Sequence, residues 1–288
     1  MSNIKNIRNK IISIENTKKI TKVMEMIATS KMLKTKINMK NSSYYIKAIK
    51  KVIEHLLLGN LEYKHNYFKK KKKNNVGFII ISSDRGLCGS LNNLLFRKTL
   101  NKIKYLKKKN INSYISIIGL KGISFFKNLN YKIVSQCDNL NIKPNLIDLI
   151  GVIKSMLNLY DKNKIETLYL SYNKFYNTMK QKPKIIKLLP INIYSDNKKK
   201  NKNRWDYIYE GDSKFLLDTL LVRYIESQIY NCVLENIVSE QSSRMIAMKS
   251  ATENSNNLIM ELKLLYNKIR QTNITKELSE IVSGTFIY

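Results

Sequence analysis

Glycine and proline divide the chain into three parts. Neither residue occurs in residues 1–58 or in residues 212–283, whereas all three prolines lie between these two stretches. Because glycine and proline are the residues least compatible with a helix interior, each stretch predicts one long helix. At about 1.5 Å per residue, such helices would be roughly 85 to 110 Å long, and helices of that length call for a partner helix.

Apolar residues in both stretches repeat with the alternating spacing of three and four residues that marks a coiled-coil seam. The first seam runs through Ile4, Ile7, Ile11 and Ile14 and then slips. It is expected to resume at Ile20, Met24 and Ile27. The second seam is more regular and consists of Met245, Met248, Thr252, Ser255, Ile259, Leu262, Tyr266 and Ile269. Because the two helices stand at opposite ends of one chain, we expect them to pair in antiparallel orientation.

The C-terminal stretch also contains a group of small side chains in a region otherwise rich in leucine and isoleucine. Small side chains let two helices approach closely, so we interpret the group as a site of tight helix packing. Its members are Ser242, Ser243, Ala247, Ser250, Ala251 and Ser255.

The middle of the chain changes from a helical period to short apolar runs typical of β-strands. The runs are residues 76–82, 113–118, 131–136 and 167–171, with a further edge strand expected at 183–190. Candidate helices at 90–109, 121–129 and 145–160 separate them. This alternation predicts an α/β fold with a mainly parallel sheet covered by helices. The expected domains are residues 1–58, an inserted α/β domain at 59–211, and residues 212–288.

Net charge adds a second hypothesis. Lysine and arginine number 52 against 21 acidic residues, giving a formal net charge of +31, a balance that nucleic-acid-binding proteins also show. Only seven of the basic residues are arginine, the residue that phosphate and base recognition favours. The excess of lysine accompanies abundant isoleucine and asparagine, three residues with adenine- and thymine-rich codons. This combination favours drift in codon composition over selection for nucleic-acid binding as the source of the charge. A lysine-rich nucleic-acid-binding coiled-coil protein remains the alternative, with binding that would weaken steeply with salt.

Candidate catalytic chemistry is sparse. The cysteines at 88, 137 and 232 and the histidines at 55 and 65 have neither disulfide nor zinc-site spacing. A polar glycine turn at 82–90 opens a predicted helix, a place where α/β folds bind anions, but it lacks the phosphate-binding glycine motifs. A nucleotide-binding enzyme with helical arms is therefore a weak third hypothesis, and Cys88 is expected to be a buried thiol.

No run of eighteen apolar residues and no apolar signal-peptide core is present in the sequence. We therefore expect a soluble or peripheral protein. Because candidate catalytic chemistry is sparse, we also expect no catalytic residues, cofactor or metal ion.

Several segments resemble the gamma subunit of bacterial F-type ATP synthase. At the N-terminal end these are IRNKIISIENTKKITKVMEMIATSKM (7–32) and GNLEYKH (59–65). The turn SDRGLCGSL (83–91), WDYIYE (205–210) and residues 239–284 continue the resemblance, which ends in ITKELSEIVSG (274–284), similar to the C-terminal signature of that family. The resemblance therefore covers nearly the whole chain, and its terminal string is highly specific.

The resemblance implies a long antiparallel coiled coil with an inserted Rossmann-like α/β domain, one copy per complex. It implies a central rotor, without catalytic activity of its own, that couples proton-driven rotation of the c-ring to ATP synthesis or hydrolysis on the beta subunits. The expected partners are the alpha3beta3 hexamer, the epsilon subunit and the c-ring, with no nucleic acid. The expected location is the cytoplasmic face of the bacterial inner membrane, reached only through the c-ring.

The resemblance also implies roles for particular residues. Coupling contacts with the alpha and beta subunits are expected at Met24, Arg244, Arg270, Gln271, Thr275 and Glu277. Residues expected to face the c-ring and epsilon are Tyr207, Tyr209 and Glu210.

Overall fold

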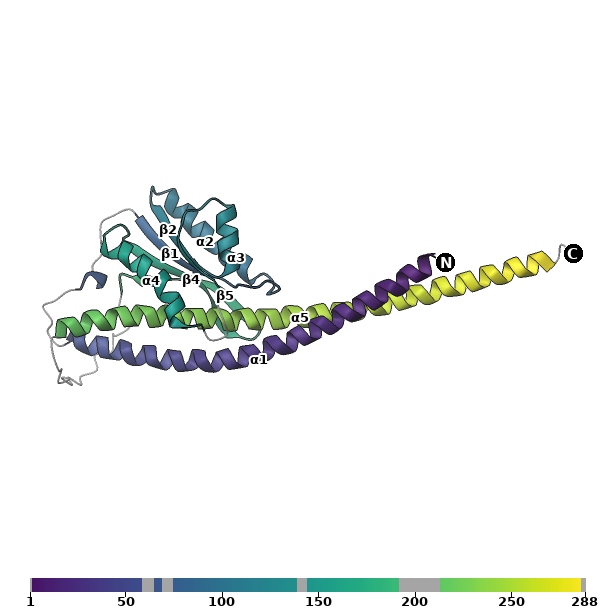
Figure 1. Ribbon diagram of the computed structural model, residues 1–288, viewed down its shortest axis with the longest axis horizontal. Helices are drawn as coiled ribbons and strands as arrows, with labels where there is room; N and C mark the ends of the chain where they lie inside the picture. Colours follow the sequence, from purple (N-terminus) through teal and green to yellow (C-terminus); the bar gives the residue numbers. More distant parts are fainter. Residues whose placement is uncertain (1, 59–64, 69–74, 139–143, 192–212, 286–288) are drawn as a thin grey trace. The chain divides into compact units, whose positions relative to one another are not determined.

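A computed structural model of the protein describes residues 2–58, 65–68, 75–138, 144–191 and 213–285 (Figure 1). The predicted Tyr207, Tyr209 and Glu210 lie outside these residues. In chain order the elements are α1 (Ser2–Leu58), η1 (Asn66–Phe68), β1 (Asn75–Ile81), α2 (Leu91–Lys107), β2 (Asn112–Ile118), α3 (Leu120–Asn128), β3 (Ile133–Cys137), α4 (Leu146–Asp161), β4 (Thr167–Asn177), β5 (Lys180–Leu189) and α5 (Ser213–Thr285).

The chain forms two compact units. Residues 1–29 and 244–288 form one unit, called here the shaft unit, and residues 30–243 form the other, called the head unit. Helices α1 and α5 each contribute to both units. The division into 1–58, 59–211 and 212–288 stays a prediction, because the two compact units cut across both long helices.

The head unit contains a five-stranded sheet in the order β3-β2-β1-β4-β5. Strands β1 to β4 are mutually parallel where they pair, and β5 pairs antiparallel with β4 at one edge. The four predicted strands, the edge strand and the three intervening helices are all present, so the α/β prediction is confirmed. The sheet is parallel because helices carry the chain back between successive strands.

Strand β4 is longer than the sequence pattern predicted. The apolar run ends at Ser171, yet the strand continues to Asn177 because β5 supplies hydrogen-bond partners along its whole length. The polar residues Asn173 and Lys174 hide this extension from a reading of hydrophobicity alone.

Strand β1 separates two apolar cores. Phe78 and Ile80 point into a core shared with α2 and α3, whereas Ile79 and Ile81 point into a core shared with α1, α4 and α5. Because successive side chains of a strand alternate between the two faces, an uninterrupted apolar run is what a strand covered on both faces requires.

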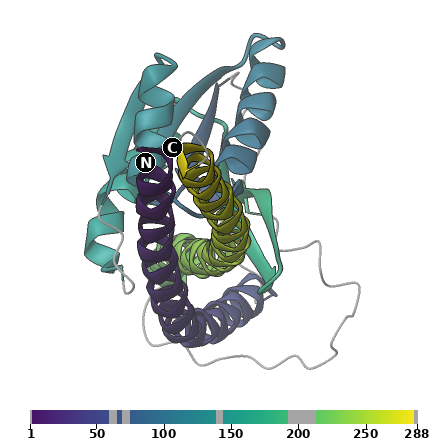
Figure 2. The ribbon, with the colours of Figure 1, turned by 90° about the vertical axis from the view of Figure 1, so that its right-hand side faces the viewer.

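In the shaft unit, α1 and α5 pair in antiparallel orientation (Figure 2). Going from Glu15 to Thr21 on α1, the partner residue on α5 moves back from Lys263 to Thr252. The predicted C-terminal seam is confirmed, since all of its residues are buried or half-buried. The first part of the α1 seam, from Ile4 to Ile14, is confirmed in the same way.

The predicted continuation of the α1 seam was wrong. Ile20, Met24 and Ile27 are exposed, and the seam continues without a slip from Ile14 through covered residues of lower hydrophobicity. These are Lys18, Thr21, Glu25 and Ala28. The helical repeat fixes which positions face α5, so side-chain polarity cannot move the seam. The opposing residues Thr252 and Ser255 are themselves small and polar, and they accommodate such partners.

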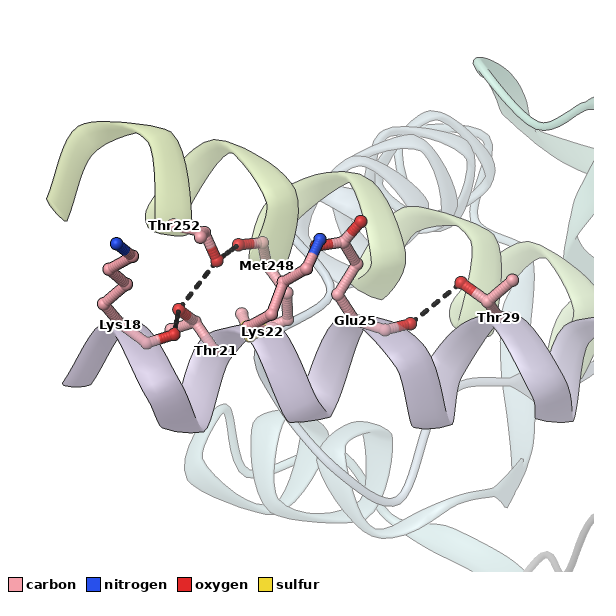
Figure 3. A network of polar contacts seen from close by, with 7 residues as sticks. All are labelled: Lys18, Thr21, Lys22, Glu25, Thr29, Met248 and Thr252. Atoms are coloured by element: carbon pink, nitrogen blue, oxygen red, sulfur yellow. Dashed lines mark hydrogen bonds and ion pairs between the residues drawn. The ribbon is translucent and has the colours of Figure 1, made fainter. Parts of the chain in front are cut away.

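A hydroxyl pair lies at the centre of this polar seam (Figure 3). The Oγ1 atoms of Thr21 and Thr252 are 2.8 Å apart and buried. Thr252 also donates to the carbonyl of Met248, and Thr21 lies 3.0 Å from the carbonyl of Lys18. A buried polar pair of this kind specifies the register of two helices, because any slip would break the hydrogen bond between the two buried hydroxyl groups.

Helix α5 continues beyond the first residues of α1 in the shaft unit (Figure 1). Every described side chain from Ile274 to Ser283 is exposed. Exposed Ile274, Leu278 and Ile281 recur at helical spacing on this single helix, so this segment presents apolar side chains that α1 does not cover.

A half-buried glutamate lies where α5 packs on the sheet in the head unit. Burial raises the pKa of Glu235, while the positive charge of Lys174, a hydrogen bond from Tyr172 and the charge of Lys184 act in the opposite direction. The Oε2 atom of Glu235 is buried and has no hydrogen-bond partner. Burial likewise raises the pKa of the neighbouring Cys232 thiol and Tyr172 phenol, so both remain neutral.

Replacing the seam threonines Thr21 and Thr252 by valine, singly and together, should measure the free energy of coupling between their hydroxyl groups. We expect Thr21→Val alone to lower the free energy of unfolding by about 1 kcal/mol, because the Thr252 oxygen loses its partner across the seam. The double variant T21V/T252V should regain most of that loss, since both polar groups are then removed. Urea unfolding of the full chain and the three variants measures this coupling; strictly additive losses would contradict it.

The variant Glu235→Gln should change how stability depends on pH. The folded-state pKa of Glu235 lies above its unfolded value of 4.5, so the carboxyl stabilises the fold while protonated, and this stabilisation is lost as the pH rises through the folded-state pKa. The variant lacks this loss and should gain stability relative to the unchanged protein from pH 4.5 upwards. Thermal unfolding between pH 4.5 and 8 tests this, and parallel curves for the two proteins would refute it.

Candidate functional site

An exposed apolar strip lies on the outer side of α1 in the shaft unit. It consists of Ile20, Val23, Met24 and Ile27, which are 57, 54, 37 and 48% exposed. Their spacing of three and four residues places them on one helix face, turned away from the seam residues Thr21 and Ala28. The predicted contact residue Met24 is thus available to a partner.

Charged groups flank this strip. The ammonium group of Lys22 lies 3.2 Å from a carboxylate oxygen of Glu25 and forms an exposed ion pair one turn long (Figure 3). Thr29 donates to the carbonyl of Glu25, which adds a further local bond to the same helix. The strip therefore combines accessible methyl and thioether groups with a neighbouring charge pair, a composition suited to protein contacts and without a nucleophile or a metal ligand set.

Arg244 and Arg270 lie on α5. Arg244 is half-buried one turn before Met248, at the first residue of the shaft unit on this helix, whereas Arg270 is exposed. The two arginines are therefore separated by seven helical turns and cannot form one site.

The other predicted residues lie near the exposed end of α5. Gln271 and Thr275 share one face, and the Thr275 hydroxyl donates to the Gln271 carbonyl over 3.0 Å. Glu277 stands seven residues after Arg270 and shares a face with it, apart from the face of Gln271 and Thr275. All four side chains are exposed. The structure thus places them on two faces of an exposed helix rather than in a pocket, and their roles stay predictions.

The glycine turn at 82–90 holds a buried thiol. The side-chain amide of Asn92 donates to the Ser83 hydroxyl over 2.6 Å and to the Cys88 sulfur over 3.5 Å. Cys88 is buried, as predicted. Gly89 has φ of 59°, a conformation that favours glycine and explains its presence in the turn.

Helix α5 reaches this turn and the adjoining strand with a row of polar side chains, called here the polar joint. The joint consists of Asn236, Ser239, Ser242 and Ser243. Ser243 donates to the Cys88 carbonyl over 2.7 Å, and Ser239 donates to the Asn173 carbonyl over 3.0 Å.

The remaining contacts of the polar joint involve β4 and the turn that follows it. The backbone amide and the side chain of Asn173 both donate to Asn236, and Ser242 donates to the carbonyl of Thr178 over 2.7 Å. Open α/β sheets usually bind ligands beside the carboxyl ends of strands such as β1 and β4. In this chain the side chains of α5 contact that region.

Sequence reasoning missed most of the polar joint. It identified Ser242 and Ser243 as small residues for helix packing, but not their hydrogen bonds to the sheet, and it did not single out Asn236 or Ser239. The available signal was the recurrence of polar side chains every three or four residues through an apolar helix. Helix packing alone requires small side chains, not hydrogen-bonding ones.

The described residues contain no group of three or more histidine, cysteine or carboxylate side chains that could hold a metal ion. None of their helices is both long and apolar enough to cross a membrane. A surface groove of about 420 Å³ between α1, α4 and α5 is lined by uncharged side chains, including Asn41, Tyr45 and Tyr230.

Comparison with known proteins gives matches along the whole chain. A family model described as ATP synthase matches residues 3–286. The ATP synthase gamma chain of Buchnera aphidicola subsp. Schizaphis graminum is 53% identical over 288 residues, covering 99% of this chain and 98% of that one. The ATP synthase gamma chain of Glaesserella parasuis serovar 5 is 48% identical over 284 residues, covering 99% of each chain.

Solved structures of ATP synthases are also similar to this chain. A chain from the central stalk and c-ring of Tetrahymena thermophila mitochondrial ATP synthase has 25% identity and a TM-score of 0.58, covering 81% of this chain and 99% of that one. A chain from the Euglena gracilis mitochondrial ATP synthase rotor shares the fold, with 18% identity, a TM-score of 0.66 and coverage of 95% and 99%. None of these similarities supports the nucleic-acid-binding alternative. The chain belongs to the ATP synthase gamma chain family, the subunits of the central stalk.

Proposed function

We propose that this chain is the non-catalytic rotor of an ATP synthase and that the exposed strip around Met24 is one of its coupling surfaces. The proposal rests on the unusual placement of apolar and polar side chains on α1. The polar side chains of Thr21 and Glu25 occupy the seam, whereas four apolar side chains face outward. These are Ile20, Val23, Met24 and Ile27. Exposing four large apolar side chains on one helix face is unfavourable in water. A partner that covers the strip during rotation would account for it.

Coupling of this kind requires only that the rotor contact different conformations of a catalytic subunit with different interaction free energies. A rotor can shift a catalytic subunit between conformations by no more than the difference in its interaction free energy with those conformations. Apolar strips and single exposed charges on a helix surface contact one partner at a time as the helix turns. The proposed catalytic chemistry therefore lies on the beta subunits, and this chain contributes contacts alone.

The remaining predicted contacts are proposed on the same basis. Arg244, Arg270, Gln271, Thr275 and Glu277 would meet the alpha and beta subunits at different rotational positions, which their spread around α5 supports. The contacts with the c-ring and epsilon are proposed to lie in the segment that contains Tyr207, Tyr209 and Glu210.

The proposed assembly has one copy of this chain in an alpha3beta3 hexamer, together with epsilon and the c-ring. It lies on the cytoplasmic face of the bacterial inner membrane and is attached to the membrane through the c-ring. The polar joint would fix α5 to the sheet of the head unit, so that torque on the head unit reaches the helix through several hydrogen bonds at once.

Co-expression with the alpha and beta subunits of the same organism tests the assembly. We expect one copy of the chain per three alpha-beta pairs after purification, and ATPase activity at least several-fold above that of alpha and beta alone. Subunit quantification and an ATPase assay measure both quantities. Purification of active alpha and beta without the chain, at low and moderate salt, would contradict the proposal.

The variant Met24→Lys tests the coupling surface. A cation in the apolar strip changes the contact energy with the beta subunits unequally among their conformations, so proton pumping per ATP hydrolysed should fall about threefold or more. Met26→Lys is a matched control, because Met26 is 59% exposed but lies on another face of α1. Proton pumping and ATP hydrolysis are measured in membrane vesicles. Equal effects of the two variants would show that charge alone, and not the strip, matters.

A further inference from the structure

Positive charge is distributed unevenly within the head unit. Residues 85–137 contain eleven lysine and arginine residues and no aspartate or glutamate. Residues 138–166 of the same unit contain four basic and four acidic residues. General drift toward lysine would affect both segments alike, so composition does not account for the contrast.

The two helices of the cationic segment, α2 and α3, cover one face of the sheet. Helices α2 and α3 pack on the sheet through Leu95, Phe96 and Phe126, and no buried residue of that core comes from α1 or α5. Their charged side chains therefore point to the outer side. The exposed ones on α2 and just after it are Arg97, Lys98, Lys104, Lys107, Lys108 and Lys109.

These cations are not neutralised by the described part of the chain. No residue of α2 or α3 forms an ion pair with a described acidic side chain. The contacts they do make involve neutral groups: Lys98 donates to the Pro183 carbonyl over 2.7 Å, and Lys109 lies 4.7 Å from the centre of the Tyr105 ring. A hydrogen bond from Lys109 lowers the pKa of the Tyr105 phenol, as expected where positive potential is high.

Apolar and aromatic side chains are exposed among the cations. Leu94 and Tyr105 are exposed on the same face of α2, eleven residues apart, and Leu120 and Leu129 are exposed at the two ends of α3. Protein interfaces combine apolar or aromatic anchors with a charged rim, whereas electrostatic attraction to lipid headgroups requires only the cations.

We propose that the outer face of α2 and α3 is a docking surface for an acidic protein surface, with Leu94 and Tyr105 as anchors and the surrounding lysines paired with carboxylates of the partner. Charge complementarity would speed association and fix its orientation. The surface shares no residue with the coupling strip on α1, so the proposal stands apart from the proposed rotor function.

Zero-length crosslinking with a carbodiimide tests the proposal, because this reagent joins lysine amines to carboxyl groups in direct contact. The ATP synthase is purified with this chain in place, crosslinked, digested and analysed by mass spectrometry. We expect peptides from residues 97–109 joined to aspartate or glutamate of another polypeptide. The pair Lys263–Glu15, 3.7 Å apart within the chain, is the positive control for the reaction.

Charge-reversal variants show whether the contact is electrostatic. In K104E/K107E/K108E, the partner identified by crosslinking should dissociate from the complex at a salt concentration several-fold lower, with about tenfold weaker binding. The neutral variant K104Q/K107Q/K108Q should bind the partner with an affinity between those of the unchanged protein and K104E/K107E/K108E. It serves as a control for a folding defect caused by charge reversal. The control K154E/K162E/K164E makes the same change in charge on exposed residues in and after α4 and should leave binding within about twofold.

Three results would overturn the proposal. The first is crosslinking of the Lys263–Glu15 pair without any link from residues 97–109 to another polypeptide. The second is equal weakening by the α2 and α4 triple variants, which would mean that only net charge matters. The third is binding of the unchanged protein to phosphatidylglycerol vesicles that K104E/K107E/K108E abolishes in the absence of any crosslinked partner. Assembly and ATPase activity are scored separately in each case, so loss of the rotor function is distinguishable.

Discussion

The antiparallel pairing of α1 with α5 is the constraint on which the rest of the structure depends. In the shaft unit these helices have only each other to pack against within the described residues, so the helical repeat decides which side chains are covered. That repeat places Thr21 in the seam and leaves Ile20 and Met24 outside it. The hydroxyl pair of Thr21 and Thr252 then specifies the register at a point where apolar contact is scarce. The exposed apolar strip on α1 is thus a consequence of how the pair is held together.

In the head unit, helix α5 forms part of the core and also donates and accepts hydrogen bonds at β4 and at the turn after β1. Apolar side chains such as Leu221 and Ile225 are buried with α4 and the sheet, while Asn236, Ser239 and Ser243 bond to the backbone beyond them. Burial supplies most of the stabilisation, but it is non-directional. Hydrogen bonds to fixed carbonyl groups add the directionality that a helix requires if it is to turn together with the domain it carries.

Charge distinguishes the two faces of the sheet more sharply than hydrophobicity does. The core on either side is apolar, yet α2 and α3 carry only cations, while α4 carries both Asp148 and Lys154. Mutual repulsion among the α2 lysines weakens the folded state slightly and raises the attraction for any acidic surface. A high overall net charge therefore conceals a local asymmetry, and that asymmetry is what carries information about partners.

The sequence by itself determined the two glycine-free helices, the C-terminal seam from Met245 to Ile269 and the strands of the sheet, because each rests on a local repeat or on a residue type incompatible with helix. It also indicated the gamma chain family through strings such as residues 274–284 and pointed to Met24. Only the tertiary structure decided that β4 continues to Asn177, that Thr21 rather than Ile20 faces α5, and that Asn236 and Ser239 bond to the sheet. The partners of Thr21, Asn236 and Ser239 lie far away in the chain, and the partner of β4 is the strand that follows it. In each case the hydrogen-bonding or packing requirement of the partner element overrides the local preference of the residue.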